Sequence, residues 1–124
     1  MQRDMDLIRK ILFTVRDASE PVIKAEGVED RIFRYHANLI IEAGLAIGPV
    51  SKEIAEAAVP AFVMLHRLTW EGHDFADSIS DDTIWKKAKD TVLKPSASWT
   101  FAILKEYLKG EIQKHIPGFD AILQ

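Results

Sequence analysis

The segment from Glu29 to Gly44 constrains the fold of this chain more than any other segment. At about 100° per residue, its apolar side chains share one broad face and its polar side chains share the opposite one. The apolar face holds Ile32, Phe33, His36, Leu39, Ile40 and Ala43, and the polar face holds Arg31, Arg34, Tyr35, Asn38 and Glu42. Gly44 suits the end of a helix because glycine accepts a positive φ. The pattern predicts an amphipathic helix with His36 projecting into apolar surroundings.

Another amphipathic helix is predicted near the N-terminus, over residues 4–18. Asp4 can cap it, and Asp6 suits the positive end of the helix dipole. Its apolar arc comprises Leu7, Ile8, Ile11, Leu12, Val15 and Ala18. Phe13 lies away from this arc, among charged residues. After Pro21, the stretch Val22–Lys24 is predicted to form a short edge strand.

The middle of the chain carries the pattern of a β-hairpin. Residues 45–50 are predicted as a strand that breaks at Gly48 and Pro49. Residues 51–59 fit either a short helix or a loop. Residues 61–68 alternate in the period of two that is typical of a strand. These features predict two short strands joined by residues 51–59, for which both alternatives, a short helix and a loop, remain.

A leucine, a threonine and a glycine follow the hairpin, as Leu68, Thr69 and Gly72. Leucine can close the core, the threonine hydroxyl can cap the next helix, and glycine permits close packing. The combination resembles the corresponding part of many winged-helix regulators. All three duties are structural, so the motif predicts a short helix over TWEGHDFADSI without indicating contact with DNA.

The C-terminal part is predicted to be helical. Ser80 can cap one helix, with Asp81 and Asp82 in its first turn, and Lys94-Pro95 ends it. Its apolar side holds Ile84, Trp85, Ala88 and Val92. Ser98 can cap a last helix that reaches about Ile116. The three tryptophans, Trp70, Trp85 and Trp99, are predicted to pack between the N-terminal domain and this helical extension.

The last helix is apolar on two sides. One stripe holds Phe101, Leu104, Leu108, Ile112 and Ile116, and the other holds Trp99, Ile103 and Tyr107. A helix of this kind has to be covered on both sides, either within its own fold or by a second subunit. Homodimerisation through Trp99, Ile103 and Tyr107 is therefore one of two hypotheses for this surface.

The predicted elements follow the order helix, short strand, helix, strand, loop, strand, helix. This order is that of a winged helix, in which the helix before the hairpin can lie in a DNA groove. We therefore predict a mainly α protein with a small β-hairpin, built as a winged helix-turn-helix-like domain over residues 1–79. Residues 80–124 are predicted to form a C-terminal helical extension packed on that domain.

Composition excludes several classes of protein. The chain has 124 residues, no cysteine and a net charge of -3, so a disulfide scaffold, a thiolate metal site and a cysteine nucleophile are excluded. No apolar run approaches the roughly 18 residues that span a bilayer, and acidic residues interrupt the N-terminus where a signal peptide would be apolar. We expect a soluble, cytoplasmic protein without a membrane partner.

The polar face of the helix over 29–44 is the candidate nucleic-acid interface. Arginine can bind guanine bidentately and asparagine can bind adenine, so Arg31, Arg34, Tyr35 and Asn38 are predicted to contact DNA bases. Arg3, Lys10 and Lys24 are predicted to contact phosphates, which position a protein without specifying sequence. Two alternatives remain open for this face, a solvated surface and a protein-binding surface, because Glu42 would repel phosphate and the chain has no basic excess.

Other residues that could bind a metal or act in catalysis have simpler structural explanations. His66, Glu71, His73, Asp74 and Asp77 suggest a metal cluster, but they form no established ligand set. His36 is predicted to be a buried, hydrogen-bonded histidine rather than a general base. No glycine-rich phosphate loop occurs. We therefore predict no metal, no cofactor and no enzymatic activity, and keep a hydrolase built on His66, His73 and Asp77 only as a remote alternative.

Three stretches of the chain together resemble an uncharacterised family. They are RDMDLIRKIL near the start, HANLIIEAGL in the centre, and RLTWEGHDFADSISDDTIWKKAK after the hairpin. The resemblance covers nearly the whole chain and is to a domain of unknown function found in bacterial and phage genomes. It implies a winged-helix-like fold and frequent prophage context, and it carries no catalytic residue over.

Two functions follow as hypotheses. The first is a small phage or prophage winged-helix protein that binds double-stranded DNA as a transcriptional regulator. The second is a non-enzymatic interaction module that modulates a host defence or transcription complex, which the slightly acidic charge balance favours.

Overall fold

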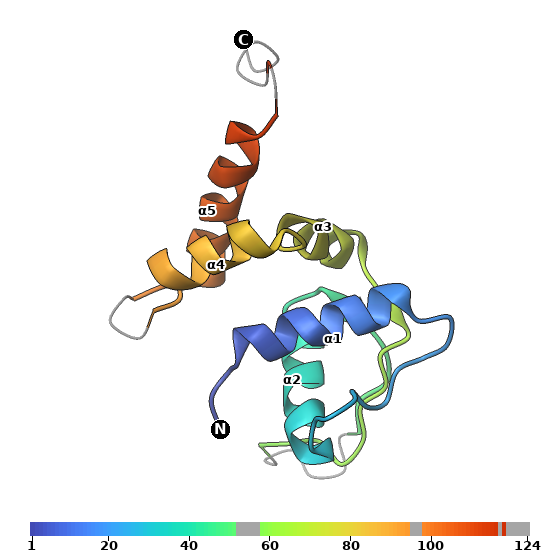
Figure 1. Cartoon of the computed structure of the whole chain (residues 1–124). Helices are drawn as coiled ribbons and strands as arrows, with labels where there is room; N and C mark the ends of the chain where they lie inside the picture. The colour runs from blue at the N-terminus through green and yellow to red at the C-terminus, as the bar shows by residue number, and fades with distance from the viewer. Residues whose placement is uncertain (52–57, 95–97, 117, 119–124) are drawn as a thin grey trace. The chain divides into compact units, whose positions relative to one another are not determined.

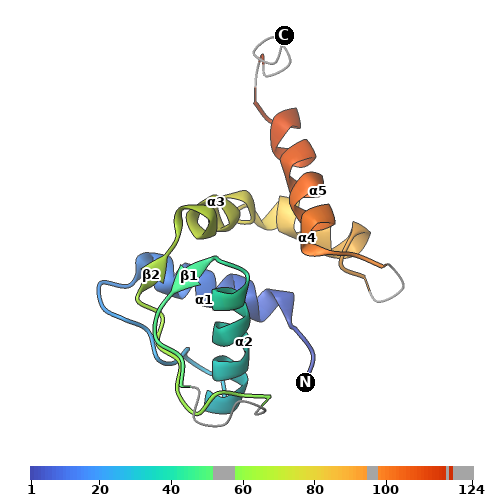
Figure 2. The ribbon, with the colours of Figure 1, turned by 180° about the vertical axis from the view of Figure 1, so that it is seen from behind.

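The computed structural model describes residues 1–51, 58–94, 98–116 and 118. The protein is mainly helical, with a small two-stranded antiparallel hairpin (Figures 1 and 2). The chain forms two compact units, Met1–Ala76 and Asp77–Gln124. The predicted fold class is confirmed in these terms. The two alternatives for residues 51–59 fall almost entirely outside the described residues.

Helix α1, Met5–Asp17, forms where its capping signal predicts. The Asp4 carboxylate accepts a hydrogen bond from the Leu7 N–H at 3.2 Å and so satisfies one of the unpaired donors at the helix start. One face of α1 is buried, through Ile8, Ile11, Leu12 and Val15. Four apolar side chains at helical spacing thus supply one wall of the core of the first unit.

Helix α2, Asp30–Glu42, is the predicted central helix, and α1 crosses it (Figure 1). Phe33, His36, Ala37 and Ile40 are buried. The buried face differs slightly from the predicted one, because Ala37 lies inside it and Ile32 is 37% exposed. Gly44 follows the helix with a φ of 77°, a conformation that favours glycine over other residues.

The hairpin contains a bulge that the alternating sequence pattern did not predict. Strand β1, Ala46–Ile47, pairs with β2, Arg67–Leu68, and a separate bridge joins Val50 to Val63. Between these two pairings the first strand advances by three residues, from Ile47 to Val50, while the second advances by four, from Val63 to Arg67. One extra residue on one strand of an antiparallel pair defines a β-bulge. The extra residue reverses the alternation, so that Val63, Leu65 and Leu68 are all buried.

The bulge explains a glycine within the hairpin. A Cβ added at Gly48 would lie 1.7 Å from the carbonyl oxygen of Met64. No larger residue fits there unless the backbone moves. The predicted edge strand is reduced to one bridge, in which Val22 pairs with Leu65.

Helix α3, Trp70–Ser78, follows β2 directly. The Thr69 hydroxyl accepts from the Gly72 N–H at 3.0 Å and donates to the Gly44 carbonyl at 2.6 Å. A Cβ at Gly72 would lie 1.8 Å from the Leu45 carbonyl oxygen. Leu68 is buried. The three structural duties predicted for Leu68, Thr69 and Gly72 are thus all observed.

The second unit contains α4, Asp82–Thr91, and α5, Phe101–Lys114. The predicted caps of both helices are wrong. Asp81 caps α4 through a 2.9 Å bond from the Ile84 N–H, while Ser80 donates to the Asp77 carbonyl instead. Thr100 caps α5 and replaces Ser98. In both helices the capping side chain accepts from the N–H three positions further along. Each true cap has other polar residues beside it, so the sequence alone does not show which of them is the cap.

The tryptophans do not share one environment. Trp85 is buried together with its predicted partners Ile84, Ala88 and Val92. Trp99 is half-buried. Trp70 is 83% exposed, so the prediction that this side chain is packed is wrong. The first residue of α3 points away from the side of the helix that Gly72, Phe75 and Ala76 bury.

Helix α5 packs through Leu104 and Leu108, which belong to the first predicted stripe. In the second stripe Tyr107 is half-buried and Ile103 is 50% exposed. Homodimerisation through this second stripe stays a prediction.

A buried carboxylate joins the two helices of the second unit. Glu111 on α5 lies 3.1 Å from Lys114 and 3.7 Å from Lys87 on α4, measured between side-chain nitrogen and oxygen atoms. The hydrogen bond from Lys114, together with the charges of Lys114 and Lys87, lowers the pKa of Glu111 below its ordinary value.

This carboxylate predicts acid sensitivity of the second unit. A carboxyl pKa that is lower in the folded state stabilises the fold above the ordinary glutamate pKa of about 4.3, and this contribution is lost as the pH falls through the lower, folded-state pKa. We expect the urea midpoint of the wild type to fall in acid more steeply than that of Glu111→Gln. Glu106→Gln, an exposed substitution on the same helix, serves as the control. Equal acid dependence of Glu111→Gln and the wild type would contradict the assignment.

Candidate nucleic-acid interface

The outward face of α2 is shaped by how its inward face packs. Phe33 and Ile40 lie in the core, which turns Arg31, Arg34, Tyr35 and Asn38 away from it. These four side chains do share one side of α2, as their spacing predicts. Their exposure differs, however, because Arg31 is exposed and the other three are half-buried.

Contacts within the first unit hold three of the four side chains. Arg34 donates from Nε to the Pro60 carbonyl at 2.9 Å, and Tyr35 donates to the Met1 carbonyl at 2.9 Å. Asn38 donates to Glu42 at 3.3 Å, one turn further along α2. The candidate face is therefore braced by the N-terminal residues and by the segment that leads into the second strand, rather than being a row of freely extended side chains.

The predicted phosphate contacts are only partly brought together. Lys10 on α1 donates from Nζ to the Glu26 carbonyl, in the turn that leads into α2. Arg3 belongs to the N-terminal segment whose first residue accepts the bond from Tyr35. Lys24 is exposed in the connection between the helices. Lys10 is thus placed close to the start of the candidate helix.

Carboxylates lie at both ends of the same helix. Glu29 caps α2 by accepting from the Arg31 N–H at 3.0 Å, and Asp30 lies in the first turn. Glu42 ends the helix. Glu29 and Asp30 favour helix formation because they lie at the positive end of the helix dipole, and all three carboxylates oppose the approach of a phosphate. The basic side chains of this face therefore have acidic neighbours at both ends of α2.

His36 is a structural residue, as the sequence predicts. It is buried, its Nε2 accepts from the Asp4 N–H at 2.9 Å, and its Nδ1 lies 2.8 Å from the Ile32 carbonyl oxygen. Because Nε2 accepts, Nδ1 carries the proton and donates to Ile32. Nε2 thus joins the residue that caps α1 to α2, and Nδ1 is bonded one turn back within α2, so both ring nitrogens have a hydrogen-bond partner.

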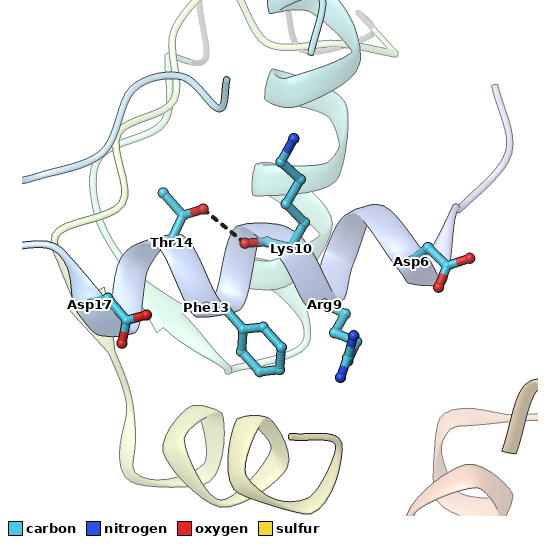
Figure 3. A pocket seen from close by; sticks show the side chains of 6 residues that line it. All are labelled: Asp6, Arg9, Lys10, Phe13, Thr14 and Asp17. Carbon is cyan, nitrogen blue, oxygen red and sulfur yellow. Dashed lines mark hydrogen bonds between the residues drawn. The ribbon is translucent and has the colours of Figure 1, made fainter. Parts of the chain in front are cut away.

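The outer side of α1 carries a cation–aromatic stack that sequence reasoning missed. The guanidinium carbons of Arg9 and Arg16 lie 4.8 Å and 4.6 Å from the centre of the Phe13 ring. The ring lines a shallow surface pocket on this helix, and Figure 3 shows how the lining residues lie. The lining residues are Asp6, Arg9, Lys10, Phe13, Thr14 and Asp17. The signal was present in the sequence, because Arg9 and Arg16 lie four positions before and three positions after Phe13.

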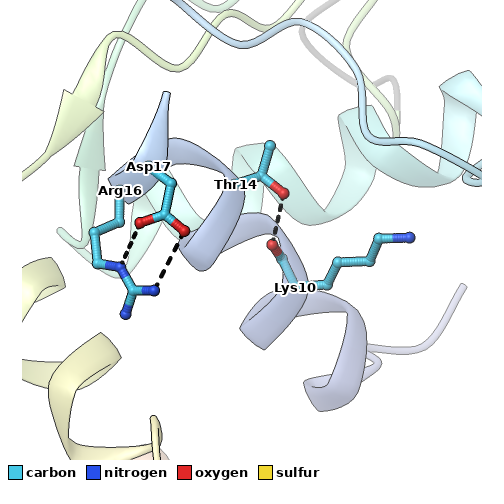
Figure 4. A network of polar contacts seen from close by, with 4 residues as sticks. All are labelled: Lys10, Thr14, Arg16 and Asp17. Atoms are coloured by element: carbon cyan, nitrogen blue, oxygen red, sulfur yellow. Dashed lines mark hydrogen bonds and ion pairs between the residues drawn. The ribbon is translucent and has the colours of Figure 1, made fainter. Parts of the chain in front are cut away.

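Ionic contacts further restrain this surface (Figure 4). Arg16 forms two hydrogen bonds to Asp17, at 2.9 Å and 3.4 Å, and these lower the pKa of the Asp17 carboxyl. Thr14 donates to the Lys10 carbonyl at 2.8 Å. Arg16 is thus paired with a carboxylate of its own helix. The pocket is lined by both acidic and basic side chains, so its surface is not uniformly basic.

Among the described residues, those that suggest a metal cluster in the sequence do not come together. Over residues 1–51, 58–94, 98–116 and 118, no three His, Asp or Glu side chains are grouped closely enough to hold a metal ion. His66 and His73 are both exposed. A separate observation concerns membranes, since no described helix has the length and apolar character needed to cross one.

Comparison with known proteins gives a family without an activity. Residues 2–98 match the model of a family described as hypothetical protein (DUF2513). A Haemophilus influenzae protein described as uncharacterized is 30% identical to this chain over 111 residues. That alignment covers 86% of this chain and 91% of the relative. No solved structure matches the chain.

Proposed function

Because the chain belongs to the DUF2513 family of hypothetical proteins, we propose its function from its own geometry: double-stranded DNA binding by a small winged-helix regulator. The proposal extends to the phage or prophage context that the family resemblance implies. In it, α2 enters the major groove and the hairpin over residues 46–68 forms the wing. The element order supports this proposal, since α2 is followed directly by an antiparallel hairpin and then by α3. One departure from the usual arrangement is that the described residues between α1 and α2 hold a turn and the Val22 bridge instead of a further helix.

The observation that carries the proposal is the pair Arg31 and Arg34 on one side of α2. The bond from Arg34 to the Pro60 carbonyl uses Nε alone, which leaves both terminal nitrogens of the guanidinium for a ligand. A side chain held in one orientation loses less entropy when it binds. Arg31, one turn before it, is exposed. The two guanidinium groups thus offer the planar donors that guanine and phosphate accept.

The remaining contacts on this face are weak enough to be exchanged. Tyr35 with Met1 and Asn38 with Glu42 are exposed hydrogen bonds, and an intramolecular hydrogen bond contributes only about 0.5–1.5 kcal/mol net. A DNA base or phosphate can replace either partner. Asn38 would then donate to adenine from the amide that now binds Glu42.

The test is a band-shift titration of labelled mixed-sequence duplex DNA at low salt. We expect wild-type binding, a loss of about tenfold or more in affinity for Arg31→Ala and for Arg34→Ala, and a shallower dependence of affinity on salt where a phosphate contact is removed. Lys109→Ala, which removes an exposed cation from α5, controls for net charge. Circular dichroism confirms that each variant is folded.

Two results would end the proposal: no binding by the wild type at low salt, or equal binding by all three variants. A second candidate would then take precedence, a protein-interaction module acting on a host defence or transcription complex. The acidic groups at both ends of α2 and the overall charge of -3 favour that candidate. A further surface of the first unit bears on it.

A further inference from the structure

The outward face of α3 has an unusual composition for a solvated helix surface. Trp70 is 83% exposed, and Glu71, His73 and Asp74 beside it are exposed as well. His73 and Asp74 lie three and four positions after Trp70, so the three side chains are neighbours on one side of the helix. Large aromatic residues are seldom left this exposed, and tryptophan is enriched at the centres of binding interfaces.

The opposite side of α3 holds this face in a fixed position. Phe75 and Ala76 are buried, and the backbone of Gly72 lies against the backbone of Leu45 so closely that no Cβ fits between them. Thr69 caps the helix and binds Gly44 with the same hydroxyl. The helix therefore cannot rotate to bury Trp70 without losing these contacts. A surface held in this way costs little further entropy when a partner binds.

The four exposed side chains form no polar or aromatic contact with any residue that the structure describes. Helix α3 contains two acidic residues in its first half, Glu71 and Asp74, and no lysine or arginine. In the part of the chain that the structure describes, no hydrogen bond, ion pair or ring contact involves the side chains of Trp70, Glu71, His73 or Asp74. An aromatic face and two carboxylates thus lie together, and each of them attracts a cation.

We propose that this face, defined by Trp70, Glu71, His73 and Asp74, is a docking surface for an arginine-bearing segment of a partner protein. Charge complementarity selects this occupant, because a guanidinium stacks on the indole ring of Trp70 while its donors pair with the carboxylate of Asp74. Arginine satisfies both groups better than lysine, whose ammonium is compact and strongly hydrated. An acidic or purely apolar partner would leave the carboxylates of Glu71 and Asp74 without compensation.

The experiment uses the full chain and two sets of labelled short peptides, which are identical except that one set carries arginine where the other carries lysine. Matched peptides with glutamate at those positions measure the background. Fluorescence anisotropy gives the dissociation constants. We expect arginine peptides to bind more tightly than lysine peptides, and Trp70→Ala and Asp74→Asn each to weaken arginine-peptide binding about tenfold or more. Asp90→Asn, an exposed acidic residue of α4, should leave binding unchanged.

Four results would overturn the proposal. Equal binding of arginine and lysine peptides would show nonspecific charge attraction, and so would equal weakening by Asp90→Asn and Asp74→Asn. Unchanged binding after Trp70→Ala would remove the indole ring from the interaction. The fourth result comes from sedimentation equilibrium. If the wild type self-associates and Trp70→Ala abolishes this association, the face binds a second copy of this chain instead.

Discussion

Gly72→Ala is expected to destabilise the first unit by about 3 kcal/mol, the upper part of the range for overpacking. An alanine Cβ would lie 1.8 Å from the Leu45 carbonyl oxygen, and the neighbouring atoms are backbone rather than a flexible side chain. Relief requires α3 to move away from the residue that follows Gly44. This movement would also strain the hydrogen bonds of Thr69 to Gly44 and Gly72. Urea denaturation followed by circular dichroism measures the loss.

Two other glycines of this chain make matched controls for Gly72→Ala. Gly44 has nothing within 4 Å of an added Cβ but a φ of 77°, so Gly44→Ala should cost only the 1–2 kcal/mol or so of a left-handed conformation. Gly110, inside α5, has open space and no positive φ, so Gly110→Ala should stabilise its helix by about 0.5–1 kcal/mol. A Gly72→Ala protein as stable as the wild type would show that α3 does not pack against Leu45 as described.

The second large effect is expected from Phe33→Ala, at about 3–5 kcal/mol of lost stability. Phe33 is fully buried on the inward side of α2 and is among the largest side chains of the core. Its removal leaves a cavity between α2 and the elements packed on it, and dense cores close such cavities only in part. Thermal or urea unfolding measures the difference from the wild type.

Ile32→Ala is the companion substitution to Phe33→Ala, one position earlier on the same helix. Ile32 is 37% exposed, so its truncation should cost well under half as much as that of Phe33. This difference tests the rotation of α2 about its axis. If Ile32→Ala were the more damaging change, the polar side that carries Arg31 and Arg34 would lie elsewhere, and the proposed DNA contacts would lose their geometric basis.

The two proposed surfaces are carried by different elements and fail separately. The proposed DNA binding would depend on Arg31 and Arg34 of α2, whereas the proposed peptide binding would depend on Trp70 and Asp74 of α3. A protein that binds DNA through the first and an arginine-bearing partner through the second would join the two functions considered for this chain. Each pair of substitutions therefore serves as a control for the other, provided that all four variants remain folded.

The candidate site was predictable to different degrees. The spacing of Arg31, Arg34, Tyr35 and Asn38 placed them on one side of a helix, and the buried environment of His36 followed from the same periodicity. Their restraints were not predictable, because Arg34 binds Pro60 and Tyr35 binds Met1 across 26 and 34 positions of the chain. The stack of Arg9, Phe13 and Arg16 lies within the reach of local reasoning, because each arginine is three or four positions from Phe13 on the same helix.

The environment of Trp70 shows where sequence patterns mislead. Its neighbours in sequence indicated a packed helix, and the helix does pack through Gly72, Phe75 and Ala76. Which side of such a short helix is buried depends on the tightest contact it makes. Here that contact is with the backbone of Leu45, and a residue distant in sequence decides that Trp70 is exposed.

The amino-acid sequence alone determined the helices, the approximate course of the hairpin, the positive φ of Gly44 and the capping duty of Thr69, since periodicity, capping and turn chemistry act over a few neighbouring residues. Tertiary structure alone decided the bulge opposite Gly48, the anchoring of Arg34 and the exposure of Trp70. Each of these depends on distances between segments that are far apart along the chain, and those distances are set by how the core as a whole fills space.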